Sequence, residues 1–160
     1  EEMNALYYVA LAEGARGSIL YRYGVPSPDG PEFMADENLE PIQLLLDMKP
    51  MLHQVVAMGT ELLDYEIDDD LLKNVEGKAA ASVYIAKDGS GKKYLMVASK
   101  DVELTQTVQI TFDAGGDAVA DLIDFLEGSS VDFTIENGLV LCQVEIQPAS
   151  GRLLGVLMAD

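Results

Sequence analysis

Tryptophan is missing from this chain, and cysteine and histidine occur only once each, as Cys142 and His53. A single cysteine excludes an internal disulfide and a cysteine-based metal cluster, so Cys142, which lies in an apolar run, is expected to be a buried and inert thiol. Catalysis by a Ser-His-Asp or Cys-His arrangement would have to use His53, which is expected to be a partly buried structural side chain. These shortages argue against a nucleophilic enzyme. They leave the cellular compartment open, with a slight preference for the cytoplasm.

Basic residues are also scarce. Ten lysines and arginines stand against 28 aspartates and glutamates, which gives a net charge of −18. A surface of this kind repels nucleic-acid phosphate and anionic lipid headgroups, so direct binding of nucleic acid is not expected. No apolar run approaches the roughly 18–20 residues that a membrane-spanning helix needs. The chain begins Glu1-Glu2 rather than with methionine, which is consistent with the removal of an upstream segment.

The chain has enough apolar residues to form a hydrophobic core, since 49% of its 160 residues are hydrophobic. A chain of this length can bury about two-thirds of its unfolded surface. It contains no repeat, low-complexity tract or long linker that would divide it. We therefore expect one domain that spans residues 1–160.

Residues 108–146 carry the most consistent local pattern. Alternate residues are apolar from 108 to 112, as in a strand with one buried face. Apolar residues then recur at helical spacing over residues 119–126, behind Asp117 as a helix N-cap, which predicts a helix. Two further strands follow, joined by Asn137-Gly138, a pair that suits a tight hairpin turn. The segment therefore predicts a strand, a helix and a hairpin.

The other elements follow from the same periodicities and from turn residues. Hairpins are predicted over residues 4–24 and 82–99, and a last strand over residues 153–158. Helices are predicted over residues 41–49, 51–64 and 68–77, with a break before Pro50 because proline disfavours helix at the preceding residue. Strands and helices fall into separate clusters. This distribution predicts the α+β class, with a largely antiparallel sheet and helices packed on it.

Two glycine-containing turns resemble functional loops but lack the residues that those loops require. Residues 88–91 read Asp-Gly-Ser-Gly, as in the middle of a calcium loop, but Ala86 and Val97 occupy positions where oxygen ligands belong, so a hairpin turn is predicted. Residues 115–116 lack the spacing of a phosphate-binding loop, and the following Asp117 would repel phosphate. We therefore expect neither a metal nor an organic cofactor.

Asp68, Asp69 and Asp70 form the densest acidic cluster. Acidic residues at a helix N-terminus favour the helix dipole, and one of them can cap the helix, so capping is the favoured interpretation. Two alternatives stay open. The carboxylates could supply oxygen ligands to a hard cation such as Mg²⁺ or Ca²⁺, or they could contact a basic partner.

Tyr7, Tyr8, Tyr21 and Tyr23 cluster in the first predicted hairpin. Exposed tyrosines offer a large contact area at low entropic cost and would form an interface. Buried tyrosines would instead belong to the core, with their hydroxyls at its rim. The sequence leaves both interpretations open.

Without a catalytic constellation, the negative charge is the main indication of function. We expect a non-catalytic acidic protein-interaction module, of the adaptor, chaperone or inhibitor type, that binds a protein partner with basic character. The residues expected to contact that partner are Asp68, Asp69, Asp70, Tyr21 and Tyr23. Two alternatives are an inhibitor that mimics nucleic acid with rows of carboxylates, and an enzyme that uses carboxylates with a divalent metal. Self-association is left open.

Overall fold

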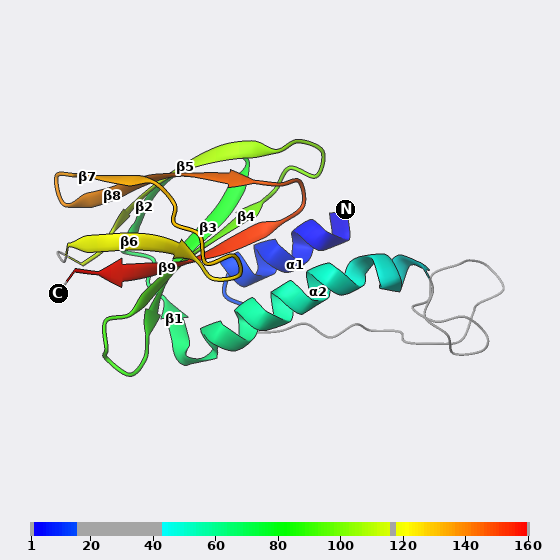
Figure 1. The fold of residues 1–160 in the computed structure, drawn as a ribbon, viewed down its shortest axis with the longest axis horizontal. Coiled ribbons are helices and arrows are strands. Elements are labelled where there is room, and N and C mark those ends of the chain that lie inside the picture. Colours follow the sequence, from blue (N-terminus) through cyan, green and yellow to red (C-terminus); the bar gives the residue numbers. More distant parts are fainter. Residues whose placement is uncertain (1, 16–42, 116–117, 160) are drawn as a thin grey trace.

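The computed structural model describes residues 2–15, 43–115 and 118–159, and Figure 1 shows how their helices and strands are arranged. The described helices are α1 (Glu2–Ala12), α2 (Gln43–Glu61) and the short 3-10 helix η1 (Leu62–Asp64). The described strands are β1 (Tyr65–Ile67), β2 (Leu72–Glu76), β3 (Ala79–Ala86), β4 (Lys93–Ser99), β5 (Gln106–Asp113), β6 (Val119–Asp124), β7 (Phe133–Glu136), β8 (Leu139–Ile146) and β9 (Gly151–Met158). Every pair of neighbouring strands is antiparallel, and the fold is α+β, as the sequence predicts.

The strands form two sheets with different neighbours. The first sheet has the order β1-β3-β4-β9-β6, and the second has the order β2-β5-β8-β7. One apolar core contains residues from both sheets, and a second core joins the first sheet to the helices. The described chain therefore has three layers, with the first sheet between the second sheet and the helices (Figure 1).

Strand β4 shows how the middle layer is built. Leu95 and Val97 point to the second sheet and pack in the same core as Phe112. Met96 and Ala98 point the other way and pack in the core beneath the helices. Successive side chains of a strand face opposite sides. A continuous apolar run is therefore what a strand in the middle layer requires.

Both hairpins with clear turn residues are confirmed. β3 and β4 pair across residues 88–91, where the Asp88 carboxylate accepts a hydrogen bond of 2.8 Å from the backbone N–H of Ser90. β7 and β8 pair across Asn137 and Gly138, whose φ angles are 52° and 81°. Two consecutive positive φ angles define the type I′ turn that Asn-Gly favours. The predicted strands at residues 108–112 and 153–158 are also confirmed, as β5 and β9.

Two segments predicted as helices, over residues 68–77 and 117–127, are wrong, because they contain the strands β2 and β6. Each of these strands lies at the edge of its sheet. The register shifts between Leu72 and Asn74 in β2 and between Val119 and Asp121 in β6, so each strand carries one extra residue. A bulge of this kind places inward-facing residues three apart, as with Val119 and Leu122. That spacing imitates the period of a helix.

The strand predicted at the start of the chain is also wrong, because residues 2–12 form α1. Its buried side chains, Ala5, Tyr8, Leu11 and Ala12, recur at helical spacing. Periodicity alone cannot distinguish a buried strand from a buried helix in so short an apolar run. Alanine and leucine, which dominate this run, favour the helix. The second half of the predicted hairpin lies outside the described residues.

Helix α2 continues through Pro50, where a break was predicted. Pro50 is exposed, whereas Met48 and Met51 on either side of it are buried against the first sheet and α1. Proline inside a helix removes one backbone hydrogen bond and costs about 3 kcal/mol. The packing of the flanking methionines offsets this loss. Neither described helix has a stretch that is long and apolar enough to cross a membrane.

Candidate functional site

Helix α1 is apolar on nearly all of its surface, which is unusual for a helix that lies in an outer layer. One side packs on the first sheet through Tyr8 and Leu11. The other side carries Leu6, which is 69% exposed, and Met3, which is also exposed. A helix that is hydrophobic all round is normally buried on all sides. The exposed side of α1 therefore has the composition of a surface that another element covers.

Helix α2 and the short helix η1 that follows it carry two apolar stripes. The first stripe is buried and consists of Met48, Met51, Val55, Met58 and Leu62. The second stripe contains Leu52, Val56, Gly59 and Leu63, which recur at i, i+4, i+7 and i+11. Val56 is 64% exposed and Leu63 is exposed as well. One stripe is enough to attach a helix to a core. The second stripe is therefore available for another contact.

A groove of about 180 Å³ runs between the two helices. Its lining residues are Tyr7, Ala10, Leu11 and Ala15 on the side of α1 and Leu52, Val55, Val56, Gly59, Thr60 and Leu63 on the side of α2. No charged residue lines it. We call this groove the helical docking face. Its chemistry suits the apolar side chains of a partner, because the hydroxyls of Tyr7 and Thr60 are the only polar side-chain groups among its lining residues.

Hydrogen bonds from three hydroxyl groups hold the helices in place. The hydroxyls of Tyr84 and Ser82, both in β3, donate to the backbone carbonyls of Leu11 and Ala12 at the end of α1, the latter at 2.5 Å. The Tyr8 hydroxyl donates to Oε1 of Gln54 in α2 at 2.6 Å. The last carbonyls of a helix lack their usual partners inside it, so these bonds give the Ala12 carbonyl a donor and add one to the Leu11 carbonyl, which also accepts from the Gly14 N–H at 3.1 Å. The groove therefore lies between two anchored helices.

Because Tyr8 is buried, the protein is expected to lose stability at alkaline pH. Burial raises the pKa of Tyr8 to about 12, above its ordinary value near 10. The folded state keeps the hydroxyl protonated, while the unfolded chain loses the proton near pH 10. The contribution of Tyr8 to the free energy of unfolding is therefore complete below about pH 10 and is lost as the pH rises to about 12.

We expect Tyr8→Phe to lose about 1 kcal/mol at neutral pH, because Gln54 is exposed and can turn to water. The variant should also lose less stability than the wild type between about pH 10 and about pH 12. Urea unfolding at a series of pH values measures both effects. If the free energy of unfolding falls equally in the two proteins between about pH 10 and about pH 12, the Tyr8 hydroxyl does not cause the loss of stability.

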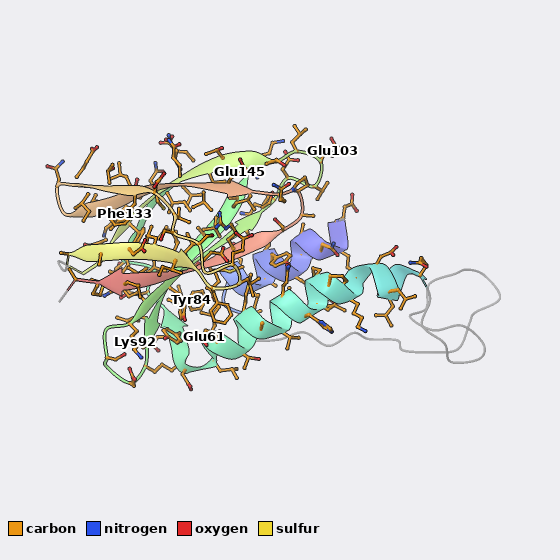
Figure 2. The ribbon with its side chains drawn as sticks, in the orientation of Figure 1. Glu61, Tyr84, Lys92, Glu103, Phe133 and Glu145 are labelled. Carbon is orange, nitrogen blue, oxygen red and sulfur yellow. The ribbon has the colours of Figure 1, made fainter. Side chains whose placement is uncertain are left out.

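Both helices end on the same side of the molecule (Figure 1), and the sequence is rich in acidic residues there. Residues 61–70 contain six acidic residues and no basic one, and Glu13 follows α1. Glu61 lies at this end and accepts a hydrogen bond of 2.8 Å from the Tyr94 hydroxyl (Figure 2). Burial and the Glu61 carboxylate together raise the pKa of Tyr94. Lys87 offsets part of the negative charge, since its ammonium group donates to the Leu63 carbonyl at 2.9 Å.

The predicted cluster of Asp68, Asp69 and Asp70 belongs to this acidic end. It forms the turn between β1 and β2 and does not cap a helix, so the capping interpretation is wrong. The Asp68 carboxylate accepts from the backbone N–H of Asp70 at 3.1 Å, while the other two carboxylates are exposed. Within the described residues, no three acidic, histidine or cysteine side chains are placed to hold a metal ion.

The remaining predicted residues have varied outcomes. Tyr21 and Tyr23 lie outside the described residues, so their role in an interface stays a prediction. Cys142 is buried in β8, as predicted, and burial raises the pKa of its thiol to about 11. His53 is exposed on α2, although partial burial was predicted. The sequence did not reveal the helical docking face, because residues 2–12 were predicted to form a strand and the groove requires the helix α1.

Comparisons with known proteins identify no family. No protein-family model matches the sequence. No curated protein matches it either. Among solved structures, the chain is weakly similar to α-L-fucosidase isoenzyme 2 from Paenibacillus thiaminolyticus, with 11% identity and a TM-score of 0.40 over 71% of this chain and 19% of that one. It is similar to the α-fucosidase of Thermotoga maritima, in complex with a mechanism-based inhibitor, with 8% identity and a TM-score of 0.37 over 77% of this chain and 29% of that one.

The chain thus spans less than a third of the length of either fucosidase. Similarity at this level carries no argument about function.

Proposed function

We propose that this chain is a non-catalytic protein-interaction module that binds a partner of basic character through its helical docking face. The observation that carries the proposal is the apolar groove between α1 and α2, among whose lining residues Val56 and Leu63 are exposed. Full burial of a valine or leucine side chain contributes roughly 1.5–3 kcal/mol. Covering the exposed parts of Val56 and Leu63 would add part of such a contribution for each side chain to the affinity.

The charge of the chain supports a basic partner. Residues 2–15 and 43–70, which build the helical layer and its acidic end, contain nine acidic residues and a single lysine, Lys49. Opposite charge on a partner accelerates encounter and disfavours acidic competitors. Asp68, Asp69 and Asp70 keep the role of attracting that partner within this proposal. The apolar groove would then provide most of the affinity.

Val56→Asp is expected to weaken association with the partner by about 30-fold or more, because a charge would enter the centre of an apolar contact worth about 2 kcal/mol. Leu104→Asp is the matched control. Leu104 is also 64% exposed, but it lies in the loop beside Glu103, on the far side of the sandwich from α2 (Figure 2). Both changes replace an exposed side chain and should leave the free energy of unfolding nearly unchanged.

The measurement is affinity capture from a cell extract with the wild-type chain and both variants as bait, followed by titration of the recovered protein. The proposal expects a protein that the wild type and Leu104→Asp retain and Val56→Asp loses. Binding should also weaken as salt rises from about 0.1 M to about 1 M, since the screening length falls from about 10 Å to about 3 Å. Equal recovery by all three baits, or no recovery at low salt, would contradict the proposal.

A further inference from the structure

We propose that the groove between α1 and α2 binds a single amphipathic helix of the partner, with its lysine or arginine residues gathered at the end that lies nearest Glu13 and Asp64. This inference rests on the proposed function and specifies the segment that the helical docking face accepts. It follows from three properties of the groove, namely its backbone chemistry, its length and its charge.

The backbone chemistry favours a helix over an extended segment. Both walls of the groove are helices, whose N–H and C=O groups are paired within α1 and α2. An extended segment laid against them would bury backbone groups without partners. A helix carries its own backbone hydrogen bonds and presents only side chains. The same apolar walls therefore accept a helix with far less loss of hydrogen bonding.

The length of the groove fits a short helix. On the α2 side it extends from Leu52 to Leu63, a rise of about 17 Å. Three to four helical turns cover that distance. Small residues, Ala10, Ala15 and Gly59, line it alongside the larger ones and leave room for leucine- or phenylalanine-sized side chains. A partner helix with apolar residues at i, i+4, i+7 and i+11 would match the second stripe of α2.

The charge distribution selects a basic helix and orients it. Both α1 and α2 end at the acidic end, where their dipoles are also negative (Figure 1). Lys49, the one lysine of the helical layer within the described residues, lies in the other half of α2. A second copy of this chain would bring carboxylates as well, because its Lys87 and Lys92 line a hollow together with Glu61, Asp64 and Asp88. Charge complementarity therefore favours a basic partner helix over self-association.

Synthetic peptides test this directly. The probe is a helix of about 14 residues with leucines at i, i+4, i+7 and i+11 and a lysine cluster at one end, made in two forms that carry the cluster at either end. There are two control peptides. One, the glutamate twin, has glutamates in place of the lysines, and the other has the same composition in scrambled order. Isothermal titration at about 0.1 M salt measures affinity, and sedimentation measures the oligomeric state of the chain alone.

The inference expects a monomeric chain that binds at least one lysine form and neither control. Val56→Asp should weaken that binding by about 30-fold or more, while Leu104→Asp should leave it unchanged. The double variant Glu13→Gln with Asp64→Asn should weaken it by about fivefold, as expected for two exposed charge pairs. Binding of the glutamate twin or the scrambled peptide as tightly as the lysine forms would overturn the inference.

Failure of this inference can be told apart from failure of the proposed function. If the chain is a dimer that Val56→Asp converts to a monomer, the groove holds a second copy and the basic helix is excluded. If no peptide binds but Val56→Asp still abolishes capture of a protein partner, the docking face is correct and the helical segment is wrong. If no peptide binds and capture is also unaffected by Val56→Asp, both proposals are overturned.

Discussion

Replacing Asp124 by alanine is expected to lower the free energy of unfolding by about 3–5 kcal/mol, the usual effect of breaking a buried ion pair from one side. Asp124 is only 3% exposed. Its Oδ2 atom accepts a hydrogen bond of 2.7 Å from Nε of Arg152 in β9. Its Oδ1 atom accepts from the backbone N–H groups of Leu126 and Glu127, at 2.9 Å and 2.8 Å. One carboxylate therefore connects the end of β6, the following turn and the neighbouring strand.

Glu127→Ala is the control for this prediction. The Glu127 carboxylate lies 4.0 Å from the same arginine, but its side chain is 71% exposed. Water and salt screen such a pair, so its removal should change stability by no more than about 0.5 kcal/mol. Urea unfolding of the wild type and both variants measures the difference. A loss below about 1 kcal/mol in Asp124→Ala would mean that the buried pair does not hold β6 in the sheet.

Replacing Gly151 by alanine is expected to lower the free energy of unfolding by about 2–3 kcal/mol, because the contact between α1 and β9 has no room for a methyl group. A Cβ atom at Gly151 would lie 2.7 Å from Cδ1 of Tyr8 and 3.0 Å from Cε of Met96. The end of the flexible Met96 side chain can move away. The buried Tyr8 ring is held in place by the hydrogen bond of its hydroxyl to Gln54. The whole of α1 would have to shift.

Gly155→Ala provides the matched control, since it makes the same change in the same strand. Its Cβ atom would lie 3.4 Å from Cε1 of Tyr94, an ordinary contact distance. We expect its stability to stay within about 0.5 kcal/mol of the wild type. If urea unfolding shows equal losses of stability in the two variants, the cause is the replacement of a glycine in β9 and not the close packing of α1 on that strand. A selective loss in Gly151→Ala would confirm the close contact beneath the helical docking face.

Turn chemistry explains which elements sequence reasoning recovered. The Asn137-Gly138 turn and the Asp-Gly-Ser-Gly turn of residues 88–91 are local, because their φ angles and side-chain bonds depend on a few neighbouring residues. The strands joined by them were therefore predicted correctly. The apolar stripes of α2 were also visible, although its continuity through Pro50 was not, because the compensating contacts of Met48 and Met51 come from distant strands.

The candidate site was harder to predict than the fold class. The acidic residues at 68–70 are evident in the sequence, and their role in binding stays a prediction. The groove depends on α1, whose apolar run fits a strand as well as a helix until its neighbours are known. The pairing of α1 with α2 brings Tyr7 and Val56 to one groove from positions about fifty residues apart. No local pattern carries that information.

The sequence by itself determined the α+β class, the two tight hairpins and the strongly negative charge. These properties depend on composition and on contacts between near neighbours in the chain. Only the tertiary structure decided that β2 and β6 are strands, because the bulges that give them a helix-like spacing form by pairing with β5 and β9. It also decided that the first apolar run is a helix beside α2, since the hydroxyls that hold its end come from β3, about seventy residues further along the chain.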